Sequence, residues 1–227
     1  MPFLLALDSA TDTMAVALVT PGLTRVFEAA GGAQASARLL PEVKALLAEA
    51  GVTMAELDAI AFGQGPGAFT GLRTACAVAQ GLAYGLGKPV LAIDSLMLVA
   101  EDARAQGAGD DVWVAMDARI GEIYAARYQH DGTAWQVLDA PALYAPAALA
   151  AHWDSPHAVA GTALSEYAEA LGPVARAWPQ ARSRAAALGA LASAAWVRGD
   201  TRDAAEALPV YVRDKVALTT AEREQRA

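Results

Sequence analysis

The segment GQGPGAFTGLR, residues 63–73, holds four glycines and one proline in eleven residues, between an apolar strand pattern and a nearly uncharged helix pattern. Glycine reaches backbone angles that other residues avoid, and Pro66 fixes φ, so residues 65–67 are predicted to form a rigid turn that places Phe69 and Thr70 at a helix start. Such a loop can present backbone N–H groups to a phosphate, allow another protein chain to approach the backbone closely, or simply join a strand to a helix. Its spacing matches neither the dinucleotide fingerprint nor a P-loop, which favours the simple turn.

Composition and charge limit the classes of protein that this chain can represent. The 227 residues are 55% hydrophobic and 19% charged, which is typical of a globular protein of one large or two small domains. The 17 basic and 25 acidic residues give a net charge of −8. Strong binding of RNA or DNA by the chain alone is therefore disfavoured.

The cysteine content and the apolar segments predict a cytoplasmic protein. Cys76 is the single cysteine, so the chain forms no internal disulfide and no cysteine cluster for a metal. The N-terminal apolar run stops at Asp8 and lacks a preceding positive region, which predicts a strand rather than a signal peptide. The uncharged run 185–197 is too short to cross a bilayer and is predicted to be a packed helix, so no membrane association is expected.

Hydrophobic periodicity predicts an α/β architecture with a mixed sheet. Three strands in a meander are followed by alternating helices and strands. The predicted strands cover residues 3–7, 14–19, 23–29, 57–62 and 89–93, and the predicted helices cover residues 36–50, 70–86 and 95–106. Ser36 is the candidate N-cap of the first helix. The polar break at 107–109 divides the chain into an N-terminal lobe, residues 1–106, and a C-terminal lobe, residues 107–227.

The second half of the chain repeats the opening pattern of the first. LLALD at residues 4–8, a turn and a second strand are echoed by WVAMD at residues 113–117, a turn and a strand from Glu122. Both patterns are an apolar strand that ends in an aspartate. The repeat suggests a duplicated architecture of two related lobes.

The two aspartates have alternative interpretations. Asp8, followed by Ser9 and Thr11, could hold hydrated magnesium beside a nucleotide phosphate, because hard cations bind carboxylate and hydroxyl oxygens. The pattern alone favours the other interpretation, in which Asp8 caps its own turn. For Asp117 the favoured interpretation is an ion pair with Arg119 within the tight turn.

Neither a metal centre nor a catalytic nucleophile is predicted. His130, His152 and His157 do not place two ligands on one helical face. No GxSxG elbow occurs, and Ala68 stands in the glycine loop where a hydroxyl would be expected. Cys76 lies among apolar neighbours, which indicates a small core residue.

The helix predicted at 70–86 is apolar on all sides, so both of its faces need cover. The sheet covers one face, and small residues on the other would let a partner helix pack closely. A partner surface is therefore predicted on this helix and on the helix that begins at Ser36. Its residues are Ser36, Arg38, Leu39, Leu40, Val43, Phe69, Thr70, Leu72, Arg73, Ala75 and Ala79.

Several ordered motifs resemble the TsaB family, also called YeaZ. They are LALDSAT, SARLLP, GQGPGAFTGLR, DARIGEIYAA and the C-terminal PVYVR, and they span nearly the whole chain. The resemblance implies the duplicated actin-like ATPase (ribonuclease H-like) α/β fold, with two related lobes and mixed sheets. Ala35, Gln64 and Ala68 depart from residues common in that family, which puts the family's polar contacts around the glycine loop in doubt.

The resemblance also implies a role in forming threonylcarbamoyladenosine (t6A) beside the tRNA anticodon. It implies a non-catalytic scaffold that pairs with the metal-bearing paralogue TsaD, works with the ATPase TsaE, forms a possible homodimer alone and meets tRNA only through the complex. No cofactor is expected on this chain alone, with ATP or ADP and Mg possible in the assembled complex. The alternative is an active ATPase or phosphotransferase that uses Asp8 to hold Mg, but DSATDTMAV lacks the glycine of phosphate-binding hairpins. A peptidase lacks both ligands and a nucleophile here.

Overall fold

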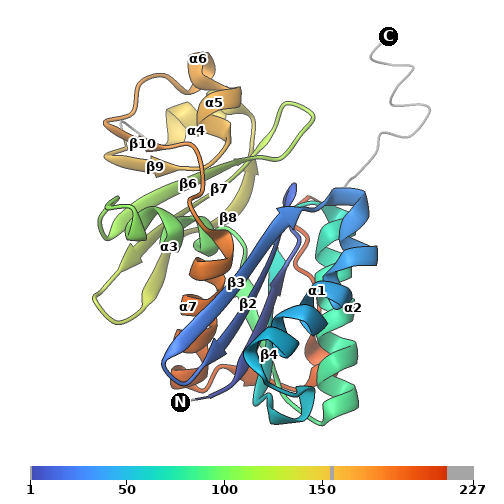
Figure 1. Cartoon of the computed structure of the whole chain (residues 1–227). Helices are drawn as coiled ribbons and strands as arrows, with labels where there is room; N and C mark the ends of the chain where they lie inside the picture. The colour runs from blue at the N-terminus through green and yellow to red at the C-terminus, as the bar shows by residue number, and fades with distance from the viewer. Residues whose placement is uncertain (1, 154–155, 214–227) are drawn as a thin grey trace, which may run out of the picture.

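The computed structural model describes residues 2–153 and 156–213 and forms two lobes, each built on one mixed sheet (Figure 1). The first sheet has the strand order β11-β5-β4-β1-β2-β3, and the second has the order β10-β9-β6-β7-β8. Apart from β11, the two orders correspond strand for strand, with a three-stranded antiparallel meander followed by two parallel strands. This correspondence agrees with the duplication that the repeated strand-aspartate pattern predicts.

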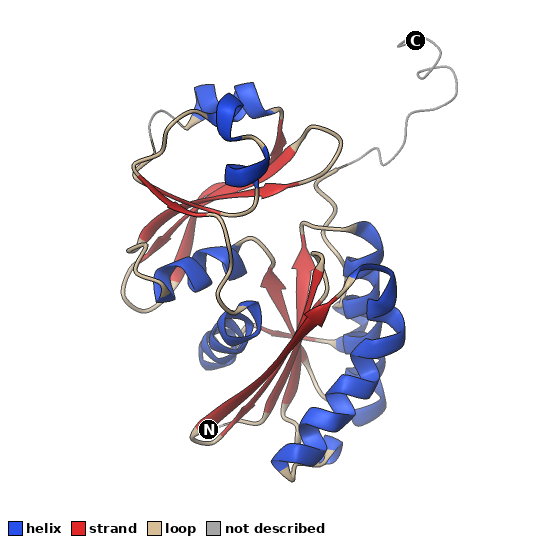
Figure 2. Ribbon diagram, turned by 45° about the horizontal axis from the view of Figure 1, so that its top comes forward, coloured by secondary structure: helices blue, strands red, loops and turns tan. Residues whose placement is uncertain are grey.

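The first lobe contains the N-terminal meander and the glycine loop. Its strands are β1 (Leu4–Asp8), β2 (Thr13–Thr20), β3 (Leu23–Ala30), β4 (Ala59–Gly65), β5 (Val90–Asp94) and β11 (Thr201–Arg202). Helices α1 (Ala35–Ala50) and α2 (Phe69–Leu86) cover one face of the sheet, and α7 (Arg184–Arg198) covers the other (Figure 2). Short 3-10 turns occur at Gly32–Gln34, Met54–Glu56 and Ala204–Glu206.

The second lobe has the same three-layer plan with shorter helices. Its strands are β6 (Asp111–Asp117), β7 (Ile123–His130), β8 (Trp135–Tyr144), β9 (Ala158–Ala160) and β10 (Arg176–Trp178). Helix α3 (Met97–Ala105) packs on the face towards the first lobe, and α4 (Pro146–His152), α5 (Ala163–Glu166) and α6 (Ala168–Leu171) lie on the far face (Figure 1).

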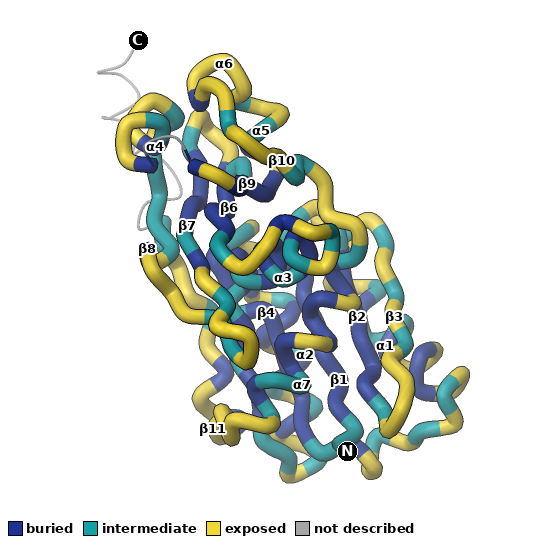
Figure 3. The backbone as a smooth tube through the Cα atoms, turned by 90° about the vertical axis from the view of Figure 1, so that its left-hand side faces the viewer, coloured by how far each residue is buried: buried dark blue, intermediate teal, exposed yellow. Residues whose placement is uncertain are grey.

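Alternation along the strands explains why helices cover both faces of each sheet. Leu5 and Leu7 of β1 point towards α1 and α2, whereas Leu4 and Ala6 point towards α7. The central strands are buried along most of their length (Figure 3). A strand that is buried on both faces is apolar at nearly every position, as LLAL is. Within the described part of the chain, no helix is long and apolar enough to cross a membrane.

Two details of the fold differ from the sequence predictions. Ser36 is exposed inside the first turn of α1 and is not its N-cap, because a 3-10 turn runs directly into the helix and the Ala35 N–H donates to the Gly32 carbonyl. After the second lobe the chain returns to the first, where α7 covers the sheet and β11 pairs with β5. The predicted division into residues 1–106 and 107–227 puts α7 and β11 in the C-terminal lobe, whereas both pack on the sheet of the first lobe.

Candidate functional site

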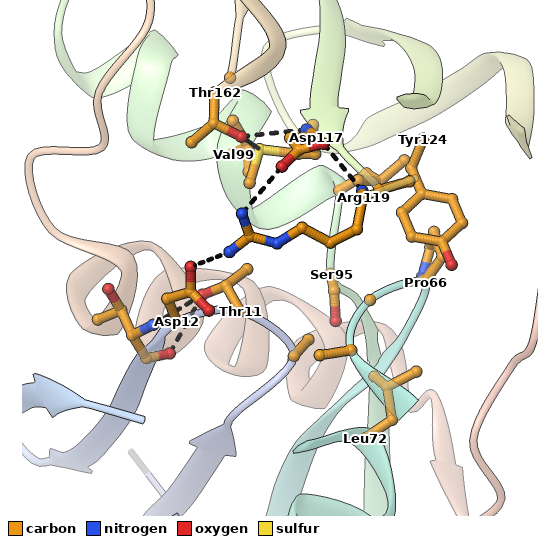
Figure 4. Close-up of a pocket in the computed structure, with 18 of the residues that line it drawn as sticks. Thr11, Asp12, Pro66, Leu72, Ser95, Val99, Asp117, Arg119, Tyr124 and Thr162 are labelled. Carbon is orange, nitrogen blue, oxygen red and sulfur yellow. Dashed lines mark hydrogen bonds and ion pairs between the residues drawn. The ribbon is translucent and has the colours of Figure 1, made fainter. Parts of the chain in front are cut away.

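A cleft of about 620 Å³ lies between the two lobes. The β1–β2 turn and the glycine loop form its first-lobe wall, and the β6–β7 turn and residues around Thr162 form its second-lobe wall (Figure 4). Ser95, Leu96 and Val99, where the chain crosses from β5 to α3, line it between these walls. Residues 210–213, at the end of the described chain, line it as well. The cleft thus brings together motifs that are far apart in the sequence.

Asp8, the candidate magnesium ligand, does not face this cleft. Its side chain is 0% exposed, and one oxygen forms an ion pair with Arg184 Nη2 at 3.2 Å. The same oxygen accepts from the Ala10 N–H at 3.2 Å, and the other accepts from the Ser95 hydroxyl at 3.0 Å. The turn-capping interpretation is confirmed by the bond to Ala10, but the ion pair with Arg184 was not foreseen.

The three residues proposed to bind nucleotide are not brought together around one space. The Ser9 hydroxyl donates to the Gly71 carbonyl at 2.8 Å and faces α2. Thr11 lines the cleft, but its hydroxyl is engaged within its own turn by the backbone of Thr13. Of the three, only Thr11 therefore borders the cleft, because Asp8 and Ser9 are buried.

The glycine loop is filled by other parts of the same chain. A Cβ on Gly71 would lie 1.8 Å from the Ser9 carbonyl oxygen, and a Cβ on Gly65 would lie 2.5 Å from the Val210 carbonyl oxygen. Gly65 also has φ of 116° and precedes Pro66 through a cis peptide bond. Close approach by segments of this chain, rather than by a partner chain or a phosphate, therefore explains these two glycines.

The β6–β7 turn carries the ion pair predicted from its sequence. Arg119 Nη1 lies 3.3 Å from Asp117 Oδ2, which confirms the prediction. Asp117 also accepts from the Arg119 N–H at 2.8 Å and from the Tyr167 hydroxyl at 2.9 Å. Arg119 reaches across the cleft as well, with Nη2 at 2.6 Å from Asp12 of the first lobe (Figure 4). Sequence reasoning did not foresee this bridge between lobes.

Arg184 is the most deeply buried charged group that the sequence analysis missed. It is 4% exposed, and its Nε has no hydrogen-bond partner within the described structure. It opens α7, where a cation opposes the helix dipole. An arginine in that unfavourable position, at the head of an alanine-rich helix, is the signal that could have indicated a buried acidic partner. The helix start is itself held by Glu28, which accepts from the Ser183 hydroxyl and the Ala185 N–H.

The predicted partner surface is only partly on the surface. Both helices turn their apolar stripe to their own sheet, which is the usual use of such a stripe, so the buried members of the predicted set pack inside this chain and are not exposed to a partner. The fully buried members are Leu39, Val43, Leu72, Ala75 and Ala79. The remaining members are exposed or half-buried, namely Ser36, Arg38, Leu40, Phe69, Thr70 and Arg73.

Cys76 is confirmed as a core residue. It is buried, its thiol donates to the Ala207 carbonyl at 2.8 Å, and burial raises its pKa. Within residues 2–153 and 156–213, no three His, Cys, Asp or Glu side chains are grouped so that they could hold a metal ion.

The two lobes, the matching sheets and the cleft between them define an α/β protein of the actin-like fold. Residues 30–182 match the family model described as TsaD, tRNA N6-adenosine threonylcarbamoyltransferase. YeaZ from Pseudomonas aeruginosa superposes with a TM-score of 0.84 at 38% identity, covering 93% of this chain and 100% of that one. The chain belongs to the TsaB (YeaZ) family.

Curated relatives carry the same family name. The chain is 38% identical over 128 residues to the tRNA threonylcarbamoyladenosine biosynthesis protein TsaB of Escherichia coli, covering 56% of this chain and 55% of that protein. It is 41% identical over 122 residues to the TsaB protein of Haemophilus influenzae, covering 53% and 51%. The chain thus spans about half the length of the curated relatives that it matches.

Proposed function

We propose that this protein is a non-catalytic scaffold and activating subunit in the synthesis of t6A on tRNA. The support for the pathway is the family membership together with the names of the curated relatives. In this proposal the chain works in the cytoplasm, pairs with TsaD, cooperates with TsaE, and meets tRNA only through the complex. Any ATP, ADP or Mg belongs to the assembled complex.

The burial of Asp8 is the observation that carries the non-catalytic role. A carboxylate that binds a hydrated magnesium ion needs access to solvent and to the nucleotide. Asp8 instead has no exposed surface and is neutralised by Arg184. The glycine loop beside it is occupied by the backbone of residues 9–10 and by Val210. These contacts disfavour the alternative of an ATPase or phosphotransferase with Asp8 as its magnesium ligand.

The proposed partner surface is the outer side of α1 and α2, now limited to residues that solvent reaches. Phe69, Thr70 and Arg73 are exposed on α2, and Tyr84 at its other end is 82% exposed. Arg38 of α1 lies against the ring of Phe27 and pairs with Glu42 at 2.9 Å. Exposed aromatic and arginine side chains are the types enriched in the energetically important parts of interfaces. We propose that the same surface pairs with a second copy when TsaD is absent.

The function is tested by measuring t6A in tRNA nucleosides by mass spectrometry. Depletion of this protein in its host should lower t6A, and purified chain added to TsaD, TsaE, tRNA and the activated threonylcarbamoyl donor should restore modification. The chain alone should neither modify tRNA nor hydrolyse ATP. ATP turnover that persists through stringent purification of the chain would overturn the non-catalytic role, and unchanged t6A after depletion would overturn the pathway.

The partner surface is tested by introducing a glutamate at different positions of α2. Ala77→Glu places it on the exposed side, and Ala75→Glu places it in the core. We expect Ala77→Glu to fold normally and to weaken association with TsaD in sedimentation experiments. Ala75→Glu should lose several kcal/mol of folding free energy, roughly the cost of an unpaired buried charge. Normal association of Ala77→Glu, and of a matched Thr70→Glu variant, would remove this side of α2 from the interface.

A further inference from the structure

The described chain ends in a segment that touches both lobes. After α7 and β11 the chain runs beside α2, where the Ala204 carbonyl accepts from the Gln80 side chain at 3.1 Å (Figure 1). Residues 208–213 then continue past the glycine loop to the β6–β7 turn, and residues 210–213 line the cleft. We name residues 208–213 the strap.

The strap is attached to the first lobe at the glycine loop. The Val210 N–H donates to the Gln64 carbonyl at 2.7 Å, and its carbonyl oxygen occupies the space that a side chain on residue 65 would need. The Tyr211 hydroxyl accepts from Arg73 Nε at 2.9 Å, and its ring lies 5.1 Å from that of Phe69. The absence of a side chain at Gly65 is thus what admits the strap.

The strap is attached to the second lobe through Arg213. Its Nη2 donates to Glu122 at 2.7 Å and to the Arg119 carbonyl at 3.1 Å. The Arg213 side chain is only 14% exposed, so the ion pair with Glu122 is partly shielded from solvent. Val212 packs against the second-lobe core between these two attachments. Both ends of the strap are therefore held by specific contacts on different lobes.

The other contacts between lobes differ in position and in strength. Away from the residues that line the cleft, the Tyr128 hydroxyl donates to Asp94 at 2.7 Å, and buried Asp102 of α3 accepts from the N–H groups of Arg182 and Ser183. The chain itself crosses between the lobes before α3 and again before α7. At the mouth, Arg119 meets Asp12, but these side chains are 69% and 84% exposed. An ion pair so exposed to water and salt holds little by itself. Of these two ion pairs at residues that line the cleft, the one made by the strap is the more shielded.

We propose that the strap fixes the angle between the two lobes and so sets the width of the cleft. The two chain crossings, before α3 and before α7, would act as the hinge, and the strap would be a removable tie across the cleft. Because Arg213 holds the Arg119 carbonyl, releasing the strap also loosens the residue that bridges to Asp12. The proposal concerns the isolated chain, so it stands or falls separately from the role in t6A synthesis.

The test measures the distance between the lobes by pulsed electron paramagnetic resonance. Spin labels are placed on the exposed positions Lys44 of α1 and Glu169 of α6, as cysteines in a Cys76→Ala background. The parent should give one narrow distance distribution. Arg213→Ala should broaden it about twofold or shift its maximum, as expected for a freed hinge motion. Arg202→Ala, an exposed arginine in β11 outside the strap, is the matched control and should leave the distribution unchanged.

If Arg213→Ala fails to fold, a milder variant tests the same proposal. Tyr211→Phe removes only the hydroxyl that Arg73 contacts. Hydrogen exchange at residues 118–122, on the opposite lobe, should then rise by roughly tenfold, as expected for a locally freed segment. A folded Arg213→Ala with an unaltered distance distribution would overturn the proposal. Unchanged exchange at 118–122 in Tyr211→Phe would overturn it equally, as would the same broadening in Arg202→Ala.

Discussion

The β1–β2 and β6–β7 hairpins begin with the same sequence pattern but differ in the residues that surround their aspartates. Asp8 is completely buried and meets Arg184, which lies 176 residues further along the chain. The Asp117 side chain is 13% exposed and borders the cleft, and it meets Arg119, which is two residues away and 69% exposed. Both aspartates accept an N–H two residues ahead, Asp8 from Ala10 and Asp117 from Arg119. This contact to a backbone N–H is shared, and the other partners of the two aspartates differ.

That difference shows how a duplicated element can have two roles. In the first lobe, α7 returns from the end of the chain and places a cation on the aspartate, so the carboxylate becomes part of the core. In the second lobe, the described helices α4, α5 and α6 are much shorter than α7, and the carboxylate lies beside the cleft, where it accepts from the Tyr167 hydroxyl. Complete burial therefore makes Asp8 part of the core, whereas Arg119, the partner of Asp117, also reaches Asp12 of the first lobe.

The largest effect is expected when the aspartate of each hairpin is replaced by asparagine in turn. Asp8→Asn leaves Arg184 charged, buried and unpaired, which should lower the free energy of unfolding by about 3–5 kcal/mol. Asp117→Asn removes a pair whose arginine is solvated, so the expected loss is only about 1 kcal/mol. Both values come from urea denaturation followed by circular dichroism. Equal losses of unfolding free energy at the two positions would contradict the expected difference between the two ion pairs.

The double variant Asp8→Asn with Arg184→Met separates a lost pair from a damaged core. If the cost of Asp8→Asn is mainly the stranded guanidinium, removing that charge should recover at least about 1–2 kcal/mol. Met retains much of the volume of the arginine stem, so packing changes little. A double variant less stable than Asp8→Asn alone would contradict the assignment of Arg184 as the charge partner.

The glycines around the first hairpin provide the next largest effect. Gly71→Ala should cost about 1–3 kcal/mol, because the new Cβ would overlap the Ser9 backbone oxygen and force the hairpin away from α2. Gly81→Ala, in the same helix with no atom near its Cβ position, should instead stabilise by about 0.5–1 kcal/mol. Thermal unfolding of the two variants measures both signs. A Gly71→Ala protein as stable as Gly81→Ala would show that the hairpin does not depend on this close approach.

The local architecture could be predicted from the sequence because periodicity and turn residues determine it. The strand around residues 59–62, the helix around 70–86 and both hairpins occur where apolar runs and aspartates predict them. The ion pair between Asp117 and Arg119 was also predictable, since its partners are neighbours in one turn. In each case the information lies within a few residues of the feature.

Features that depend on distant segments were not predictable in this way. Periodicity shows that α1 and α2 carry apolar residues but not which stripe meets their own sheet, so Leu39 and Ala75 were assigned to a partner. The glycines of the loop indicate that another segment comes close to the backbone, but not that this segment contains Val210. The partner of Asp8 is Arg184 of α7, and no local sequence pattern indicates that this helix packs on the first lobe.

The smallest expected effect concerns the bridge from the second hairpin to the first. Arg119→Ala removes the exposed contacts to Asp12 and Asp117, so the free energy of unfolding should change by only about 0–1 kcal/mol, with less effect at high salt. Arg198→Ala, which removes another exposed pair with Asp200, is the control and should have a similar small effect. Urea titrations at low and high ionic strength measure both variants. A loss at Arg119 as large as that at Asp8 would mean that the bridge is a principal support of the lobe arrangement, and the contrast between the two hairpins would then fail.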